Sequence, residues 1–246
     1  MEPRFNEFMQ AIGEPLPHWR GAQAPGREPL IGSYCRLEAV DVERHAEDLY
    51  AAYSQAKDPR DWTYLVAGPF DSLDAYREYL TRIAGLTDPL HYAVIDLASG
   101  AALGTLSLMR IDPANGVMEV GSITFSPLLK QTRIASEAIF LLMKYAFEDL
   151  GYRRFEWKCD TLNAPSRAAA LRFGFSFEGI FRQAIVYRGR NRDTAWFSII
   201  DPEWPALRAG FMQWLAASNF DAHGQQLERL ADLIARQRAS AAKSGS

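Results

Sequence analysis

The hydrophobic positions between residues 119 and 150 change from one period to another. Residues 119–125 form a short run with β-branched and aromatic side chains that stops at Ser126 and Pro127, as expected of a strand. Apolar side chains then recur at intervals of three and four, which predicts a helix with one apolar face. The residues on that face are Ile134, Ala138, Leu141, Leu142 and Tyr145. Thr132 is expected to cap the start of the helix and Gly151 to end it.

This strand, loop and helix predict a place that suits an anion. The backbone N–H groups of the first helical turn have no acceptor within the helix, and the helix dipole is positive at that end. A phosphate group would be held well there. A plain crossover connection without a ligand is the alternative.

The pattern before residue 119 predicts helices first and strands afterwards. A strand at residues 34–37 is followed by helices capped by Asp41 and by Asp71, the second of which ends at Gly85. Strands follow at residues 91–97 and 102–111. The segment between the two helices carries Trp62, Tyr64 and Phe70, which either line a pocket or close the edge of the core.

The pattern after residue 150 predicts a strand at residues 153–159, a short helix at 164–172, and a hairpin of residues 175–187 and 193–200. Helices are expected at residues 206–217 and 225–236, and residues 239–246 are small and polar enough to be disordered. Residues 1–30 contain five prolines and three glycines, so we expect an irregular extension with Phe5, Phe8 and Trp19 against the body.

The domain organisation follows from this order of elements. We expect an irregular N-terminal extension at residues 1–30, one domain at residues 31–202, and a C-terminal helical extension at residues 203–246. The predicted fold class is α/β (α+β), with a mixed sheet flanked by helices. Its connections are too uneven in length for a doubly wound sheet.

Composition narrows the classes of function. The 246 residues carry a net charge of −3, which gives no reason to expect nucleic acid or an acidic membrane surface as a partner. We also expect no membrane span, no signal peptide and a cytoplasmic location. Two cysteines and four scattered histidines form neither a disulfide framework nor a metal site.

Three motifs in this order resemble the GCN5-related N-acetyltransferase (GNAT) superfamily, and more narrowly its RimJ/RimL-like branch. They are Ala135-Ser136-Glu137-Ala138, then Asn163-x-x-Ser166 with Phe173-Gly174-Phe175, then Arg192-Asp193 with Phe197-Ser198-Ile199. The resemblance spans roughly residues 31–201, the extent of one domain. It implies an enzyme that moves the acetyl group of acetyl-CoA to a primary amine, either a protein N-terminus or a small molecule.

The resemblance also implies a set of residues around acetyl-CoA. They are Thr124, Phe125, Ser126, Lys130, Gln131, Thr132, Arg133, Ile134, Ala135, Ser136, Asn163, Ser166 and Phe173. The loop departs from the family pattern Gln/Arg-x-x-Gly-x-Gly/Ala, because Arg133 stands at a glycine position and Gln131 replaces a second common glycine. Either Lys130 or Arg133 contributes charge in a shifted loop geometry, or binding of CoA is weak or lost.

The chemistry requires a base for the amine and a hydrogen-bond donor for the departing thiolate. Glu119 is the candidate base, with a strand-end carboxylate in a surface ion pair as the alternative. Many family members use a tyrosine where this chain has Ala170, so the resemblance assigns the donor role to Ser166. The negative charge of Glu137, in the first turns of the helix, is expected to interact favourably with the helix dipole, and Glu137 is not expected to act as a catalyst.

Substrate contacts are expected from four aromatic residues, namely Trp62, Tyr64, Phe70 and Tyr187. Arg188, Arg190 and Arg192 cluster at a turn, where they either bind an acidic peptide or form a solvated charged turn.

Two alternatives to an acetyltransferase are kept. A GNAT-like fold could bind acyl-CoA or a peptide without catalysis. The C-terminal helices could also form a homodimer surface, because Leu207, Phe211, Trp214 and Leu215 give an apolar face that packs on the domain or on a second copy.

Overall fold

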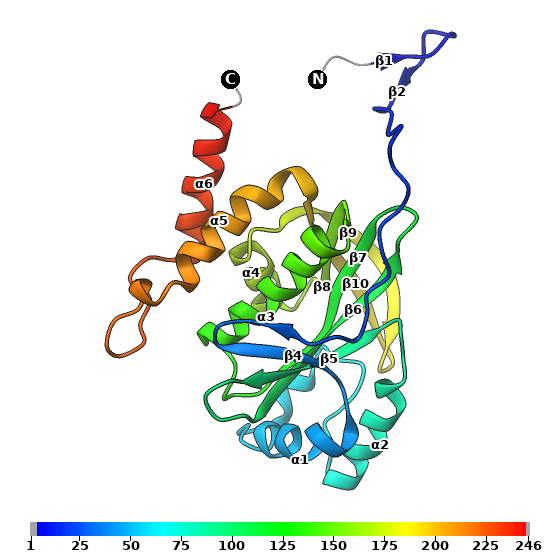
Figure 1. Ribbon diagram of the computed structural model, residues 1–246. Coiled ribbons are helices and arrows are strands. Elements are labelled where there is room, and N and C mark those ends of the chain that lie inside the picture. Colours follow the sequence, from blue (N-terminus) through cyan, green and yellow to red (C-terminus); the bar gives the residue numbers. More distant parts are fainter. Residues whose placement is uncertain (1–3, 245–246) are drawn as a thin grey trace.

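An eight-stranded mixed sheet forms the centre of the computed structural model, which describes residues 4–244 (Figure 1). The strand order is β3-β4-β5-β6-β7-β8-β10-β9. The bounds are β3 Leu30–Ile31, β4 Cys35–Ala39, β5 Leu90–Asp96, β6 Ala102–Asp112, β7 Val117–Phe125, β8 Arg154–Asp160, β9 Ser176–Tyr187 and β10 Arg190–Ile200. All neighbours pair antiparallel except β7 and β8, which are parallel.

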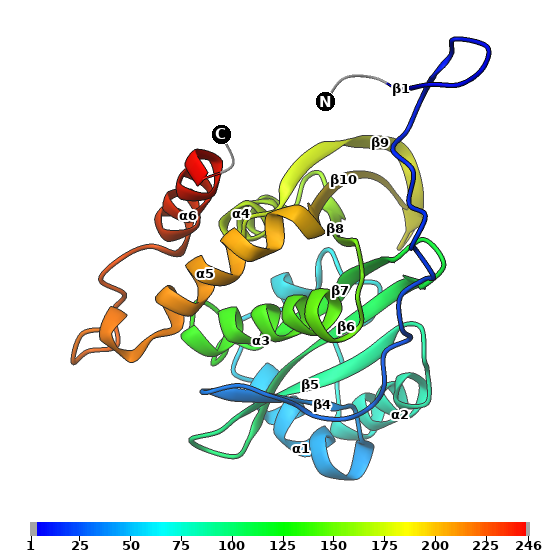
Figure 2. The same cartoon turned by 45° about the horizontal axis from the view of Figure 1, so that its top comes forward.

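Helices cover both faces of this sheet (Figure 2). Helices α1 (Val42–Tyr53) and α2 (Leu73–Ala84) lie on one face, and α3 (Arg133–Lys144) with α5 (Trp204–Leu215) on the other. Helix α4 (Ala164–Arg172) contacts β8 and β9, and α6 (Leu230–Ser244) packs on α5. The strands supply both cores by alternation: Tyr92 and Val94 of β5 face α3, while Ala93 and Ile95 face α1 and α2.

The predicted strand, loop and helix around residue 126 are confirmed. Thr132 caps α3 by accepting a hydrogen bond from the Ala135 N–H at 3.2 Å. The helix ends earlier than expected, because residues Tyr145–Asp149 continue as one π-helical turn. Gly151 then takes the left-handed conformation, with φ of +74°.

Three expectations about element ends and caps are wrong. Ser72, not Asp71, caps α2, because its hydroxyl accepts from the Ala75 N–H. The last helix is Leu230–Ser244, not residues 225–236, so the segment 239–244 is helical and not disordered. Residues 245–246 lie outside the described part of the chain.

The N-terminal extension is only partly irregular. Strands β1 (Arg4–Phe5) and β2 (Ala11–Ile12) pair as a small hairpin that projects from the body (Figure 1). Phe5 and Phe8 were expected against the body but are exposed, whereas Trp19 is half-buried and its indole N–H donates to the Ala114 carbonyl at 2.8 Å.

The apolar face of the first C-terminal helix packs on the domain. Leu207 and Phe211 are fully buried in the same core as α3, and the Phe140 and Phe211 rings stack at 5.3 Å. This face is therefore not open to a second copy. Among the described residues, no helix is long and apolar enough to cross a membrane.

Glu137 holds the start of β4 against α3. Its buried carboxylate accepts the backbone N–H groups of Ser33, Tyr34 and Cys35, each at 2.7 Å. The neighbouring Gly32 has no room for a side chain, because a Cβ there would lie 2.6 Å from the carboxylate. Glu137 is thus a structural anion, and its charge serves the β3–β4 turn in place of the helix dipole.

We expect Glu137→Gln to lower the free energy of unfolding by about 2–4 kcal/mol, because an amide offers one oxygen and turns an NH₂ group toward backbone donors. Urea denaturation would measure this. Glu47→Gln is the control, since Glu47 is an exposed partner of Arg77 and should change stability by less than about 1 kcal/mol. A Glu137→Gln effect as small as that control would contradict the assignment.

Candidate active site

The parallel strands β7 and β8 separate in the middle of the sheet. Their register runs from Val117 opposite Arg154 only as far as Val120 opposite Trp157. Beyond that point β7 pairs with β6 alone, and β8 pairs with β10 alone. The facing edges of residues 121–125 and 158–160 therefore carry backbone groups without a strand partner, which calls for another hydrogen-bonding group between them.

A β-bulge lies where the strands separate. The register between β6 and β7 shifts between Ser107 opposite Gly121 and Thr105 opposite Thr124, and Ser122 has φ of +48°. At the end of β7, the Tyr53 hydroxyl of α1 donates to the Thr124 carbonyl at 3.0 Å. The Ser126 N–H is already used, because it donates to the Leu103 carbonyl at 3.2 Å.

The loop before α3 keeps a glycine-type backbone without its glycines. Gln131 has φ of +61°, the left-handed region in which glycine is most at ease. The guanidinium of Arg133 lies 3.8 Å from the centre of the Tyr34 ring and 4.5 Å from that of Phe220. The loop backbone thus takes a left-handed conformation at Gln131, and Arg133 is held by aromatic rings.

Lys130 is tied to the segment between α1 and α2. Its ammonium lies 2.5 Å from the Asp61 carboxylate, within the 3₁₀ helix Pro59–Trp62. Of the two loop cations considered from the sequence, each therefore already has a partner. Ser136, also expected near acetyl-CoA, is buried, and its hydroxyl accepts from the Arg172 guanidinium at 3.1 Å.

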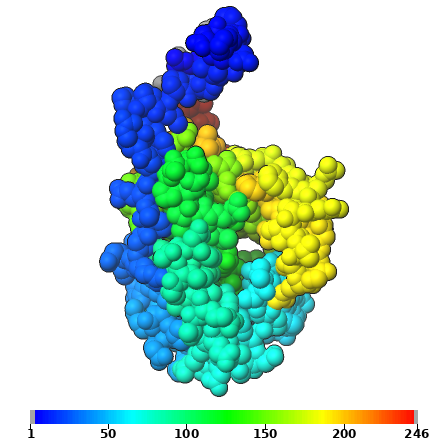
Figure 3. Space-filling view, turned by 90° about the vertical axis from the view of Figure 1, so that its right-hand side faces the viewer, coloured from blue at the N-terminus to red at the C-terminus, as the bar shows by residue number. Residues whose placement is uncertain are grey.

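The segment between α1 and α2 contacts the β9–β10 hairpin at the far edge of the sheet. Arg188 donates to the Gly68 carbonyl, and Arg190 donates to the Thr63 carbonyl at 2.8 Å. The space-filling view shows an opening bounded by this segment, the β9–β10 hairpin and the green strands (Figure 3). Arg188 and Arg190 thus remain exposed at the turn while donating to this segment, and Arg192 donates to the Thr194 hydroxyl at 3.2 Å. Binding of an acidic peptide by this cluster stays a prediction.

The four aromatic residues expected at the substrate do not form one group. Trp62 and Phe70, with rings 5.5 Å apart, line a cavity of about 210 Å³ together with Tyr53 and Tyr76. The Tyr64 hydroxyl instead donates to the Leu162 carbonyl at 3.0 Å. Tyr187, at the end of β9, is buried, and its hydroxyl donates to the Asp160 carboxylate at 2.9 Å.

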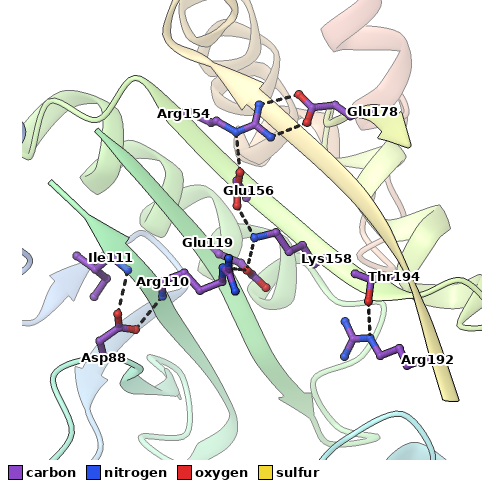
Figure 4. A network of polar contacts seen from close by, with 10 residues as sticks. All are labelled: Asp88, Arg110, Ile111, Glu119, Arg154, Glu156, Lys158, Glu178, Arg192 and Thr194. Atoms are coloured by element: carbon purple, nitrogen blue, oxygen red, sulfur yellow. Dashed lines mark hydrogen bonds and ion pairs between the residues drawn. The ribbon is translucent and has the colours of Figure 1, made fainter. Parts of the chain in front are cut away.

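Glu119 lies in a buried network of charges on the face opposite α3 (Figure 4). Its carboxylate is 2.9 Å from the Lys158 ammonium and 3.6 Å from the Arg110 guanidinium. Burial raises the pKa of Glu119, and the charges of Lys158 and Arg110 oppose that rise. The alternative of a surface ion pair is wrong, because the Glu119 side chain is only 7% exposed.

Ser166 lies next to Trp157, the last residue of β8 that pairs with β7. The Trp157 indole N–H donates to its hydroxyl oxygen at 3.0 Å, and the hydroxyl is also within hydrogen-bonding reach of the Cys159 thiol. Asn163 caps α4 by accepting the Ser166 N–H at 3.2 Å. Phe173 is buried beside Trp157, with ring centres 6.1 Å apart. Glu119 and Ser166 thus flank the point of divergence from opposite faces of the sheet.

Two residues of this site were missed in the sequence. Tyr53 belongs to no motif, and its hydroxyl contacts both β7 and β6. Lys158 belongs to no motif, and the one signal for it in the sequence is its position in a strand between the apolar Trp157 and Cys159. Among residues 4–244, no group of histidine, cysteine, aspartate or glutamate could hold a metal ion, and both cysteines are free and buried.

Comparisons with known proteins agree on one family. Residues 36–176 match the acetyltransferase (GNAT) domain. A GCN5-related N-acetyltransferase from Brucella melitensis has 48% identity and a TM-score of 0.88, over 89% of this chain and 100% of that one. "Putative ribosomal N-acetyltransferase YdaF" of Bacillus subtilis (strain 168) is 28% identical over 68% of this chain and 90% of its own. The "Ribosomal-protein-serine acetyltransferase" of Escherichia coli (strain K12) is 34% identical over 33% of this chain and 45% of its own.

A substitution at Gln131 tests the loop conformation. The left-handed region costs a residue with a Cβ roughly 1–2 kcal/mol, which exceeds the entropic cost of glycine of about 0.5–1 kcal/mol. Gln131→Gly should therefore raise the free energy of unfolding by about 0.5–1 kcal/mol, measured in urea. Gln55→Gly, at an exposed turn position outside the left-handed region, should lower it. Destabilisation by both would contradict the described loop.

The pair of Arg154 with Glu178 predicts a dependence of stability on acid. Hydrogen bonds from Arg154, 2.5 Å away, lower the pKa of Glu178 from 4.5 to about 2. A lowered carboxyl pKa stabilises the fold above pH 4.5, and this contribution disappears as the pH falls toward 2.

In that interval, wild type should lose about 1 kcal/mol more stability than Glu178→Gln, a modest figure because Glu178 is 40% exposed. Chemical denaturation at a series of pH values would show parallel curves if the pair contributed nothing.

Proposed function

Because this chain belongs to the GNAT family of N-acetyltransferases, we propose that it transfers the acetyl group of acetyl-CoA to a primary amine where β7 and β8 diverge. The observation that carries this proposal is the divergence itself. It leaves backbone groups of residues 121–125 without a strand partner, and it has a base candidate on one face and a hydroxyl on the other. Acetyl-CoA as donor also fits the cytoplasmic location expected from the sequence.

The residues present fit acetyl-CoA. The unpaired edge of β7 offers N–H donors for the amide groups of its pantetheine arm and for the thioester carbonyl. The start of α3, with Gln131 in the left-handed region, offers the backbone N–H groups of Arg133 and Ile134 to the pyrophosphate. The left-handed Gln131 and the Arg133 guanidinium held against Tyr34 and Phe220 support binding of CoA without the two glycines.

In the reaction, the amine nitrogen attacks the thioester carbon. A C–N bond forms, the C–S bond breaks, and the proton of the amine goes to Glu119 directly or through a water. CoA leaves as a thiolate that the Ser166 hydroxyl stabilises by donating a hydrogen bond. The thiolate then takes a proton from solvent to give the thiol, and Glu119 returns the proton of the amine to solvent. Because the hydroxyl oxygen already accepts from Trp157, its hydrogen is oriented away from that indole.

The acceptor is a primary amine, either at a protein N-terminus or in a small molecule. The names of two relatives, which specify ribosomal proteins, direct the first test to peptides. A peptide that begins with serine and has a free α-amine should be compared with the same peptide blocked at that amine and carrying one lysine. A small primary amine completes the set.

We expect release of free thiol from acetyl-CoA with at least one of these amines. Glu119→Gln should lower kcat/KM by about 10²–10⁴, the usual contribution of a general base. Ser166→Ala should lower it about 10–100-fold, the worth of a hydrogen bond to a charged group. Glu47→Gln and Ser99→Ala, at exposed positions, are the matched controls.

Saturable binding of acetyl-CoA without thiol release for any amine would favour the alternative of a non-catalytic binding protein. Full activity of Glu119→Gln would instead remove the role given to that carboxylate.

A further inference from the structure

Lys158 occupies an unusual position for a lysine. It is the first residue of β8 beyond the last pair with β7, and its side chain is only 6% exposed. Its ammonium lies 2.9 Å from Glu119, 2.5 Å from Glu156 and 3.7 Å from the centre of the Trp196 ring (Figure 4). A buried cation is retained at a cost in desolvation, so its partners identify what it does.

Those partners are two carboxylates that face each other. Glu119 and Glu156 are directly opposite in the β7–β8 register, and both side chains are less than a tenth exposed. Two buried carboxylates at neighbouring positions repel each other, and the charge of Glu156 raises the pKa of Glu119. Lys158 lies within ion-pair distance of both.

No other cation replaces Lys158 beside Glu119. Arg110 on β6 is 3.6 Å from Glu119, but its side chain is 61% exposed and its charge is therefore screened by water. Arg154 on β8 contacts Glu156 and Glu178 and makes no contact with Glu119. The charged neighbours that face Glu119 are therefore Arg110 from β6 and Lys158 and Glu156 from β8.

We propose that Lys158 is a positioning residue that keeps Glu119 ionised and fixed at the point where β7 and β8 diverge, so that Glu119 can accept the proton of the attacking amine. The inference rests on the proposed function for its catalytic consequence, but the ionisation of Glu119 is a property of the fold alone. Burial raises the pKa of Glu119 and the Lys158 charge opposes that rise. Without Lys158, the charge of Glu156 would face Glu119 with no buried cation between the two carboxylates.

The decisive measurement is a ¹³C NMR titration of the glutamate carboxyl groups, with the Glu119 signal assigned by its loss in Glu119→Gln. We expect Lys158→Met to raise the apparent pKa of Glu119 by about one unit or more, since an opposite charge at this distance shifts a pKa by about 1–3 units. Lys158→Arg should restore most of the wild-type value. Lys144→Met, which removes a charge from the last turn of α3, is the matched control and should change nothing.

Kinetics provide a second readout. In Lys158→Met the acidic limb of the kcat/KM pH profile should move to higher pH by the same amount, and Glu119→Gln should lack that limb. The double variant Glu119→Gln, Lys158→Met should lose no more activity than Glu119→Gln alone, because both changes act through one carboxylate.

An unchanged Glu119 titration in a folded Lys158→Met protein would overturn the inference. So would a fall in melting temperature with the acidic limb unmoved, since that is the effect of a merely structural lysine. If the titration shifts as expected but wild type acetylates no amine, the proposed function fails and the role of Lys158 in ionising Glu119 stands.

Discussion

The separation of two parallel strands is the constraint on which the rest of the structure depends. β7 and β8 share four register pairs and then part, each remaining bound to its other neighbour. Backbone groups in the middle of a sheet are normally paired, so the open edges are tolerated only because other groups surround them. A bulge with Ser122 in the left-handed region starts the separation, and Tyr53 holds the end of β7 from the opposite helix layer. The start of α3 then lies next to the widening gap, where its free N–H groups can serve a phosphate.

The alternation of β8 assigns one chemistry to each face of the sheet. Phe155, Trp157 and Cys159 belong to the core under α3, while Glu156 and Lys158 point to the other face. Trp157 therefore reaches Ser166, and Lys158 reaches Glu119. The charges of this network are balanced: the buried Glu119 and Glu156 meet the buried Lys158, and the more exposed Arg110, Arg154 and Glu178 bring the totals to three carboxylates and three cations. Balance of this kind allows a base to stay charged inside a protein, where an isolated carboxylate would take up a proton.

Local signals explain which features could be predicted from the sequence. The apolar stripe and Thr132 predicted the start of α3, and the alternation of apolar and polar residues predicted the long strands. Both signals depend only on residues close together in the sequence. The end of the last helix was predicted too early because Arg238, beyond that end, donates to the Gly174 carbonyl at 2.7 Å and lies 3.4 Å from Glu203, tertiary contacts that a small and polar tail does not indicate. Phe5 and Phe8 were wrongly expected to be buried, since the composition of the N-terminal extension does not indicate whether it lies against the body. At the site, Glu119 was predicted from its place on the strand before the loop and Ser166 from the resemblance to the family motif, and both roles stay predictions. The partners Tyr53, Lys158 and Asp61 come from other elements, and no spacing along one chain predicts their contacts.

Hydrogen exchange of individual backbone amides, with and without acetyl-CoA, tests the central claim most directly. If acetyl-CoA occupies the gap between the strands, the amides of residues 121–125 and of Arg133 and Ile134 should exchange more slowly when it is bound. Amides of β5, which are paired on both sides, should not change. Protection confined to another surface while the amides of residues 121–125 exchange as before would show that the divergence of β7 and β8 is not the binding site, and would contradict the account.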